Sequence, residues 1–413
     1  MTNNKEMKIV FLADDFPPKS LGGAGIVACD LADGLKKRGY EIFVITTVQK
    51  KEEEGNINMF GFNIFKIYSN YHPRWQPYLS LYNPKTILKV EKIIKRIKPD
   101  IVHAHNIHYH LSYDSLRVAK KYAKAVFLTA HDVMLIHTGK LMPKNGNCMF
   151  KLSALDQIKD AKKRYNPFRN IIIKHYLKYV DRIFAVSNTL KNVLEVNGIK
   201  NIETIYNGID IGDWQINTKE VENFRKKFGI QNKKVILFGG RLSGAKGGEV
   251  ILRAISLAIK EVKNIVLLVA GDKDWYAEKM IKLTREIGIY ENIRFTGWLQ
   301  RESMKCAFFV SDICVTPSIY LDPFNLFNIE AGAAKKPVIG TCFGGTMEII
   351  IENKTGYIVN PNKIELMAEK IIDLLKNSEK AKQFGEAGHK RVAEHFLLNL
   401  QIDKILKWYK KYV

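Results

Sequence analysis

The sequence predicts an α/β protein made of two Rossmann-like, doubly wound domains that face a central cleft. Short apolar segments alternate with helical patterns, most of these segments end in polar or small residues, and the alternation starts again near mid-chain. Parallel strands joined by helices are buried on both faces and read as continuous apolar runs. At 413 residues the chain also exceeds the size at which one core keeps growing, so two domains are expected.

The first half supplies the first of these sheets. It opens with a buried strand at residues 8–14 (KIVFLAD), followed by a glycine-rich loop and an amphipathic helix at 26–39 with a basic C-terminal end. Further strands are predicted at residues 40–47, 100–106, 124–132 and 181–188. Ligands of doubly wound sheets bind beyond the carboxyl ends of the strands. Those ends carry Asp14, His105, His131 and Ser187.

The second half repeats the pattern. Its strands are predicted at residues 233–242, 264–272, 292–297, 312–318 and 336–341. The expected domains are residues 1–210 and 211–395, and a basic amphipathic helix at 396–413 is expected to pack back on the first domain.

The composition limits the compartment and the partners. The net charge of +23 leans toward residues 1–210, which hold 33 Lys and Arg against 19 Asp and Glu. This charge predicts attraction to a membrane leaflet, a nucleic acid or a phosphorylated substrate, although a general bias toward lysine is the plain alternative. The five cysteines are scattered and form no CxxC pair, which suits a reducing cytosol. No apolar run suits a signal peptide or a membrane span, so a cytoplasmic protein is expected.

One glycine-rich loop of the second half suits an anion. The segment GGRLSGAKGG at 239–248 places Arg241 and Lys246 directly after a predicted strand. Glycines let a backbone approach an anion closely, and the two cations suit a diphosphate. The spacing is not that of a P-loop, and a solvated turn with ordinary surface cations is the structural alternative.

The segment DPFNLFNIEAGAAKKPVIG at 322–340 holds two acids, Asp322 and Glu330. A helix is predicted to begin after Pro323, so the backbone N–H groups of Phe324, Asn325 and Leu326 lie at its start. A helix N-terminus offers unpaired donors to a phosphate. Carboxylates only accept hydrogen bonds and therefore suit sugar hydroxyls, although a buried salt bridge is also possible.

These motifs resemble the retaining GT-B glycosyltransferases of family 4, the group 1 glycosyltransferases. The second half carries residues 239–248, 322–341 and 344–359, and the first half carries similar segments around PPKSLGGAG and VHAHN…LTAHD. The chain departs from the family pattern at Asp322, where Glu is usual, and at Asn325, where Gly is common. The loop after Lys246 is also shorter than usual.

The resemblance implies transfer of a hexose-type sugar from a nucleotide-diphosphate sugar to a saccharide or lipid-linked hydroxyl, with no metal or other cofactor. The first domain would then bind the acceptor and the second domain the donor. Arg241 and Lys246 would neutralise the diphosphate, and His131 would lie beside the reacting sugar. The donor-binding residues implied are Gly22, Gly23, Asp322, Phe324, Asn325, Leu326 and Glu330, with Asp322 on the transferred sugar and Glu330 on the ribose.

Two metal hypotheses are less favoured. Five histidines lie between His103 and His131, but His103 and His105 alternate along a predicted strand, and packing or acceptor contact explains the group as well. The pair Asp272 and Asp274 forms a D-x-D in GDKDWY, yet the two cations of the same half would replace a metal.

The segment at 158–182 contains eight Lys and Arg residues and an apolar stripe. It is expected to form a basic amphipathic helix that either lies on an anionic membrane or packs on the core with a solvated basic face. Two other functions are kept open: a sugar-phosphate synthase or nucleotide-sugar epimerase of the same fold, and a basic nucleic-acid-binding protein. No nucleic-acid-binding module is recognisable, so nucleic acid is not expected as a partner.

Overall fold

The computed structural model describes residues 7–18, 22–144, 146–147, 149–161, 165–271, 273 and 275–413, with residues 275 and 276 described by their backbone alone. The chain forms two compact units. The first comprises Met1–Gly139, Met149–Gly208 and Leu398–Val413, and the second comprises Lys140–Cys148 and Ile209–Leu397. Residues 140–148 belong to the second unit, although they lie within the range 1–210 predicted for the first domain.

The first unit contains a sheet of eight strands in the order β3-β4-β2-β1-β5-β6-β7-β8. Its strands are β1 (Lys8–Leu12), β2 (Glu41–Val48), β3 (Gly55–Met59), β4 (Phe62–Tyr68), β5 (Ile101–His105), β6 (Ala125–Ala130), β7 (Arg182–Ala185) and β8 (Ile202–Thr204). Its helices are α1 (Gly23–Lys37), α2 (Gln76–Leu79), α3 (Pro84–Ile97), α4 (Asp114–Tyr122), α5 (Ala154–Ala161), α6 (Arg169–Tyr176), α7 (Asn188–Val196) and α16 (Leu398–Tyr412). All neighbouring strands are parallel except β3 and β4.

The second unit contains a parallel sheet of six strands in the order β11-β10-β9-β12-β13-β14. Its strands are β9 (Lys234–Gly239), β10 (Ile265–Ala270), β11 (Ile293–Phe295), β12 (Ile313–Thr316), β13 (Val338–Thr341) and β14 (Gly356–Val359). Its helices are α8 (Thr218–Lys227), α9 (Gly248–Ala258), α10 (Trp275–Glu286), α11 (Arg301–Val310), α12 (Leu326–Ala333), α13 (Thr346–Ile349), α14 (Ile364–Lys376) and α15 (Ser378–His395). Doubly wound α/β architecture in two units is thereby confirmed.

Apolar runs explain the central strands. Every residue of β10 is buried, as are the last four of β1, because helices cover both faces of each sheet. One cluster of buried side chains packs α9 and α14 on one face of the second sheet, and another packs α11 and α12 on the opposite face. The hairpin of β3 and β4 was not predicted. β3 is the edge strand of the sheet and has no buried residue, and polar residues interrupt the apolar run of β4 next to it.

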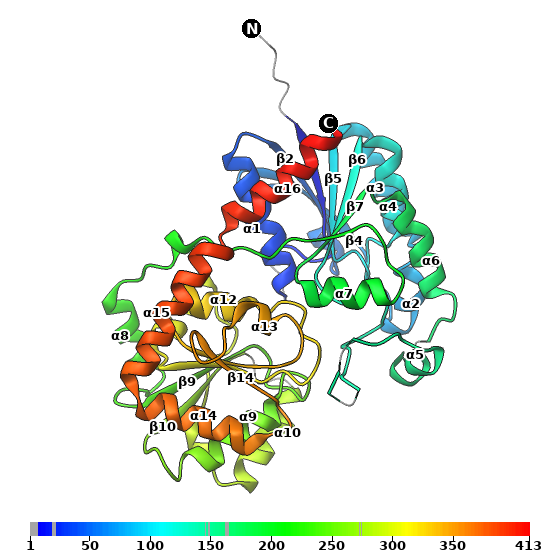
Figure 1. Cartoon of the computed structure of the whole chain (residues 1–413). Coiled ribbons are helices and arrows are strands. Elements are labelled where there is room, and N and C mark those ends of the chain that lie inside the picture. Colours follow the sequence, from blue (N-terminus) through cyan, green and yellow to red (C-terminus); the bar gives the residue numbers. More distant parts are fainter. Residues whose placement is uncertain are drawn as a thin grey trace. The chain divides into compact units, whose positions relative to one another are not determined.

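The C-terminal helix α16 belongs to the first unit, where it packs on α1 (Figure 1). Tyr409 on α16 is fully buried, and Arg38 at the end of α1 forms an ion pair with Asp403. The Gln401 side chain accepts a hydrogen bond of 2.9 Å from the Gly208 N–H. The last helix of the chain therefore packs in the first unit. The preceding helix, α15, packs on α12 and α14 in the second unit.

The basic segment at 158–182 is not one helix, so that prediction was wrong. It contains the end of α5, then α6, a short 3₁₀ turn and the first residue of β7, and residues 162–164 lie outside the described residues. Pro167 gives the physical reason, because the residue before a proline disfavours helical geometry. Asn166 instead accepts a hydrogen bond from the Phe168 N–H and donates one to the Pro77 carbonyl.

Candidate active site

The glycine-rich loop after β9 brings Lys246 to the carboxyl end of the second sheet. Its Nζ lies 2.9 Å from Oδ2 of Asp322, across 76 residues of sequence. Gly247 has φ of +78°, and a Cβ there would lie 1.8 Å from the Pro317 carbonyl oxygen, so the turn requires glycine. Arg241 lies earlier in the same loop and is exposed.

Asp322 is 5% exposed and accepts several hydrogen bonds. Besides Lys246, the Ser318 hydroxyl donates at 3.2 Å and the Asn325 amide donates at 3.3 Å. Burial opposes the charge on Lys246, but the Asp322 carboxylate and Tyr320 hold the pKa of Lys246 above its ordinary value. Lys246 is therefore a charged ammonium group beside Asp322.

The backbone of Asp322 is held by the loop that carries Gly344 and Gly345. The Gly345 N–H donates to the Asp322 carbonyl at 2.9 Å. Gly344 has φ of +84°, and a Cβ there would lie 2.0 Å from that carbonyl oxygen. The close approach explains why glycine occupies the first position of the predicted Gly-Gly motif.

Helix α12 begins directly beside this ion pair. Asn325 is its N-cap and accepts a hydrogen bond of 3.2 Å from the Phe327 N–H, while its own amide reaches Asp322. Asn325 therefore links the helix start to the carboxylate, which glycine at this position could not do. Asn328 ties the helix to the sheet through Thr316 at 3.0 Å.

The remaining predicted donor residues of the second unit lie on the same short segment. Glu330 is half-buried within α12, one helical turn beyond Leu326. The Phe324 side chain is buried against Phe396, with ring centroids 5.9 Å apart, so only its backbone is available at the helix start. The structure thus gathers Lys246, Asp322 and the start of α12, and the roles predicted for the individual residues stay predictions.

Two side chains of the same site were missed by sequence reasoning. Tyr320 precedes Asp322 by two residues, and its ring lies 5.5 Å from the Lys246 Nζ. Lys140 comes from the short segment 140–148 of the second unit, and its Nζ lies 4.6 Å from the same ring centroid. No local signal marks Lys140, because a chain separation of 180 residues lies between it and Tyr320.

Gly22 and Gly23 lie in the first unit, at the start of α1. Gly22 is the N-cap, with φ of −149°, which any residue adopts, and a Cβ there would have no neighbour within 4 Å. The described backbone thus gives no steric reason for glycine at position 22. Residues 19–21, which precede it in the predicted loop, lie outside the described residues.

A row of histidines crosses the carboxyl ends of β5 and β6 in the first unit. His103 is fully buried and contacts the Tyr409 hydroxyl at 2.6 Å and the Thr129 hydroxyl at 2.8 Å, which makes it a core residue. His105 Nδ1 lies 2.9 Å from His131 Nε2, and the two rings stack. Burial lowers the pKa of His131 to about 4, so the predicted sugar-contacting histidine is neutral at pH 7.

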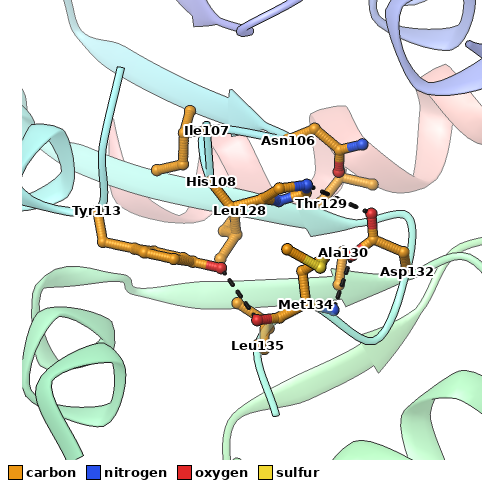
Figure 2. A pocket seen from close by; sticks show the side chains of 10 residues that line it. All are labelled: Asn106, Ile107, His108, Tyr113, Leu128, Thr129, Ala130, Asp132, Met134 and Leu135. Atoms are coloured by element: carbon orange, nitrogen blue, oxygen red, sulfur yellow. Dashed lines mark hydrogen bonds and ion pairs between the residues drawn. The ribbon is translucent and has the colours of Figure 1, made fainter. Parts of the chain in front are cut away.

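A small cavity lies next to this row, between the ends of β5 and β6 (Figure 2). His108 points toward Asp132, with 3.6 Å between Nε2 and Oδ2, and that buried nitrogen has no hydrogen-bond partner among the described residues. Asp132 also accepts a hydrogen bond of 2.8 Å from the Met134 N–H, which orders the loop after β6. This arrangement offers polar groups beside His131 and is too small for a sugar.

Asp14, at the end of β1, clamps the loop that follows β5. Its carboxylate accepts hydrogen bonds from the N–H groups of Tyr109, His110 and Leu111 at 2.7–2.9 Å. Burial raises the pKa of Asp14 to about 7, against the effect of these three donors. The contacts assign Asp14 to the architecture of the loop.

The described residues test only the metal hypothesis for the histidines. Within the described ranges, no group of three or more His, Cys, Asp or Glu side chains could hold a metal ion. Asp272 and Asp274 of the D-x-D lie outside the described residues.

Comparison with known proteins identifies the family. Residues 220–391 match the family described as Glycosyl transferases group 1, and residues 21–213 match Glycosyltransferase Family 4. An uncharacterized glycosyltransferase of Methanocaldococcus jannaschii is 28% identical over 89% of this chain and 89% of its own length. The N-acetyl-alpha-D-glucosaminyl L-malate synthase of Bacillus anthracis is 24% identical over 95% of this chain and 93% of its own length.

Solved structures share the fold along the chain. The sucrose-phosphate synthase of Thermosynechococcus elongatus superimposes with a TM-score of 0.79 at 19% identity, covering 98% of this chain and 99% of that one. HepE of Anabaena, solved in complex with UDP and glucose, gives a TM-score of 0.74 at 16% identity and covers 98% of this chain and all of its own. Together with the two family matches, these findings show that the chain belongs to the group 1 glycosyltransferases and has the GT-B fold.

Proposed function

We propose that this glycosyltransferase moves a hexose-type sugar from a nucleotide-diphosphate sugar to a hydroxyl acceptor and retains the anomeric configuration. The observation that carries the proposal is the Lys246–Asp322 pair at 2.9 Å beside the start of α12. A diphosphate suits Lys246, Arg241 and the helix start, since all three favour negative charge. Sugar hydroxyls suit Asp322, because a carboxylate accepts their hydrogen bonds.

No metal is part of this proposal. Charge develops on the leaving diphosphate as its bond to the sugar breaks, and preorganised cations stabilise that charge without reorganisation. The departing phosphate then accepts the proton of the attacking hydroxyl on the same face of the sugar, which accounts for retention without a covalent intermediate. His131 is neutral at pH 7 and serves as a hydrogen-bond partner of the reacting sugar.

The first experiment is a thermal-shift panel of nucleoside diphosphates and their sugars, followed by turnover with the best donor. UDP-glucose is the natural starting point, because HepE was solved with it. Arg241→Ala and Lys246→Ala should each lower the rate at least ~10²-fold, whereas Arg253→Ala on α9, an exposed i,i+4 partner of Glu249, should not. EDTA should leave turnover intact, and NMR of the product should show the donor's anomeric configuration.

Near-normal turnover in both cation variants, or an inverted product, would refute this mechanism. The acceptor is tested with saccharides, lipid-linked saccharides and sugar phosphates. A preference for a sugar phosphate would make the enzyme a sugar-phosphate synthase, and cleavage of the donor without an acceptor would indicate an epimerase. Binding that ignores nucleotide sugars and falls steeply with salt would indicate a nucleic-acid-binding protein.

We further propose that the acceptor is lipid-linked and that the first unit docks on an anionic membrane. Exposed apolar side chains gather on α5 and at α6, where Leu155 is 77%, Phe168 64% and Ile171 67% exposed. Exposed lysines flank them, including Lys159 and Lys174. Apolar side chains with basic neighbours suit the interface of an anionic leaflet. In the described part of the chain, no helix has the length and apolar character needed to span a bilayer.

Vesicle sedimentation tests this docking. The double variant Leu155→Ser/Ile171→Ser should bind vesicles of phosphatidylglycerol and phosphatidylcholine at least about tenfold more weakly than the wild type, because two apolar side chains no longer enter the interface. Val196→Ser on α7, which is 46% exposed, is the matched control. Equal binding by all three proteins would contradict docking through α5 and α6.

A further inference from the structure

The short segment 140–148 belongs to the second unit through specific contacts. The Leu321 N–H donates to the Leu141 carbonyl at 2.9 Å, and the Leu141 side chain is 1% exposed. These contacts hold the segment next to the residues that precede Asp322. The contacts of Leu141 consequently hold the backbone of the adjacent Lys140 at the site, whichever conformation the Lys140 side chain adopts.

Lys140 and Lys246 lie near one aromatic ring. The ammonium groups are 4.6 Å and 5.5 Å from the Tyr320 ring centroid, distances at which a cation is attracted to the π face. Tyr320 is 7% exposed, so it is a buried support for both cations. Among the described carboxylates, Asp322 contacts this group, and it accepts hydrogen bonds from Lys246, Ser318 and Asn325.

Among these described side chains, positive charge exceeds negative charge. Lys140 and Lys246 carry two positive charges beside Tyr320, and Asp322 carries one negative charge. Burial and the charges of Lys246 and Arg241 lower the pKa of Lys140 to about 8, although Asp322 opposes this effect. A bound anion would relieve the repulsion, and a nucleotide sugar brings one negative charge on each of its two phosphates.

We propose that Lys140 is a third cation of the donor site and that it binds the diphosphate together with Arg241 and Lys246. This inference rests on the proposed function and adds a residue that the family motifs of the second half do not contain. A surface lysine that only packs its stem on Tyr320 is the alternative, and it predicts no change in diphosphate affinity when the charge is removed.

Calorimetry with UDP, or with whichever nucleoside diphosphate the thermal-shift panel selects, tests the proposal. Lys140→Met keeps an unbranched side chain of similar length and removes the charge, so it should weaken diphosphate binding about tenfold or more, as expected for loss of one charge-assisted contact. The matching nucleoside monophosphate should lose less affinity than the diphosphate. Lys144→Met, an exposed position of the same segment, should bind the diphosphate like the wild type.

A pH series separates a charge contact from a structural role. Wild-type affinity for the diphosphate should fall as pH rises through about 8, where Lys140 loses its proton. Lys246 and Tyr320, which lie beside Lys140, do not lose their protons near pH 8, because the pKa values of both are raised. Lys140→Arg stays charged at these pH values and should remove the decline while keeping the affinity.

The outcomes distinguish this inference from the proposed function. Unchanged diphosphate affinity in Lys140→Met, with a large loss in Lys246→Ala, would overturn the role of Lys140 and leave the donor site standing. A wild-type protein that binds no nucleoside diphosphate would overturn both. If Lys140→Met has the same thermal-unfolding midpoint as the wild type, the variant is folded, and a loss of diphosphate affinity is caused by the loss of the Lys140 charge.

Discussion

Lys246 and Asp322 form an ion pair of 2.9 Å in the second unit, between the loop after β9 and the segment that leads into α12. The proposed function assigns the cation to the diphosphate and the carboxylate to the sugar. In the structure, the charges of Lys246 and Asp322 neutralise each other. Under the proposed function, Lys246 turns from Asp322 to the diphosphate of the donor, and Asp322 turns to the sugar of the same donor. Recognition of the sugar is therefore coupled to recognition of the diphosphate.

Asp322→Asn tests this coupling. Removing the carboxylate frees Lys246, so affinity for the nucleoside diphosphate should stay equal or increase. Turnover of the nucleotide sugar should fall about 10²-fold or more, because an amide accepts hydrogen bonds from the sugar hydroxyls more weakly than the Asp322 carboxylate does. Calorimetry measures the first effect and initial rates measure the second.

Asp373→Asn is the matched control, since Asp373 pairs with Lys380 at 2.8 Å elsewhere in the second unit. It should leave both quantities unchanged. Parallel losses of diphosphate affinity and turnover in Asp322→Asn would contradict the division of roles.

His131 should act as a neutral group whose position depends on His105. His131→Ala should lower kcat about 10²-fold, within the usual range for a positioned hydrogen-bonding or proton-transferring side chain. His105→Leu removes the partner of His131 Nε2 at 2.9 Å and should lower kcat by about tenfold without a matching change in diphosphate affinity. Because the pKa of His131 is about 4, its protonation should not change the rate between pH 5.5 and 7.

His175→Ala, at an exposed position of α6, controls for the loss of a histidine as such. A rate that falls with a midpoint near pH 6.5 in the wild type and not in His131→Ala would show that His131 titrates normally and would overturn the neutral role.

Acid should destabilise the first unit through its buried histidines. Burial lowers the pKa of His103 to about 3 and that of His131 to about 4. Their stabilising contribution is present above the unfolded value of about 6.5 and is lost as pH falls toward the folded values. At pH 5.5 each such histidine lowers the free energy of unfolding by about 1.4 kcal/mol relative to pH 7.5.

Asp14 contributes with the opposite sign. Its pKa is raised to about 7, so its contribution is lost as pH rises from about 4 toward 7 and is regained on acidification. Asp14→Asn removes this compensation, and urea unfolding at pH 7.5 and 5.5 should show a larger acid loss in the variant than in the wild type. An acid loss that is equal in both proteins would show that Asp14 does not titrate in this range.

Gly344 should be required for the stability of the second unit. Gly344→Ala places a Cβ 2.0 Å from the Asp322 carbonyl oxygen at φ of +84°, so it should lower the free energy of unfolding by about 2 kcal/mol or more. Gly244→Ala is the control, because a Cβ there meets nothing within 4 Å. Urea midpoints measure both, and equal midpoints would contradict the close approach.

The sequence by itself determined the fold class and the family. Continuous apolar runs such as those of β1 and β10 mark strands buried on both faces, and local periodicity suffices to find them. The edge hairpin β3–β4 and the break at Pro167 escaped the prediction, because polar residues interrupt the first and an apolar stripe continues past the second. Motif spacing also selected Arg241, Lys246, Asp322 and Glu330 as candidates, although it could not assign their partners.

Only the tertiary structure decided which side chains meet. Lys140 reaches Tyr320 from a distant segment, Asn325 joins the cap of α12 to Asp322, and His105 contacts His131 across two strands. The last helix likewise returns to the first unit, where Tyr409 contacts His103. Such contacts depend on the order of the strands in each sheet and on the return of the C-terminal helix to the first unit. Both bring distant residues together without leaving a periodic signal in the sequence.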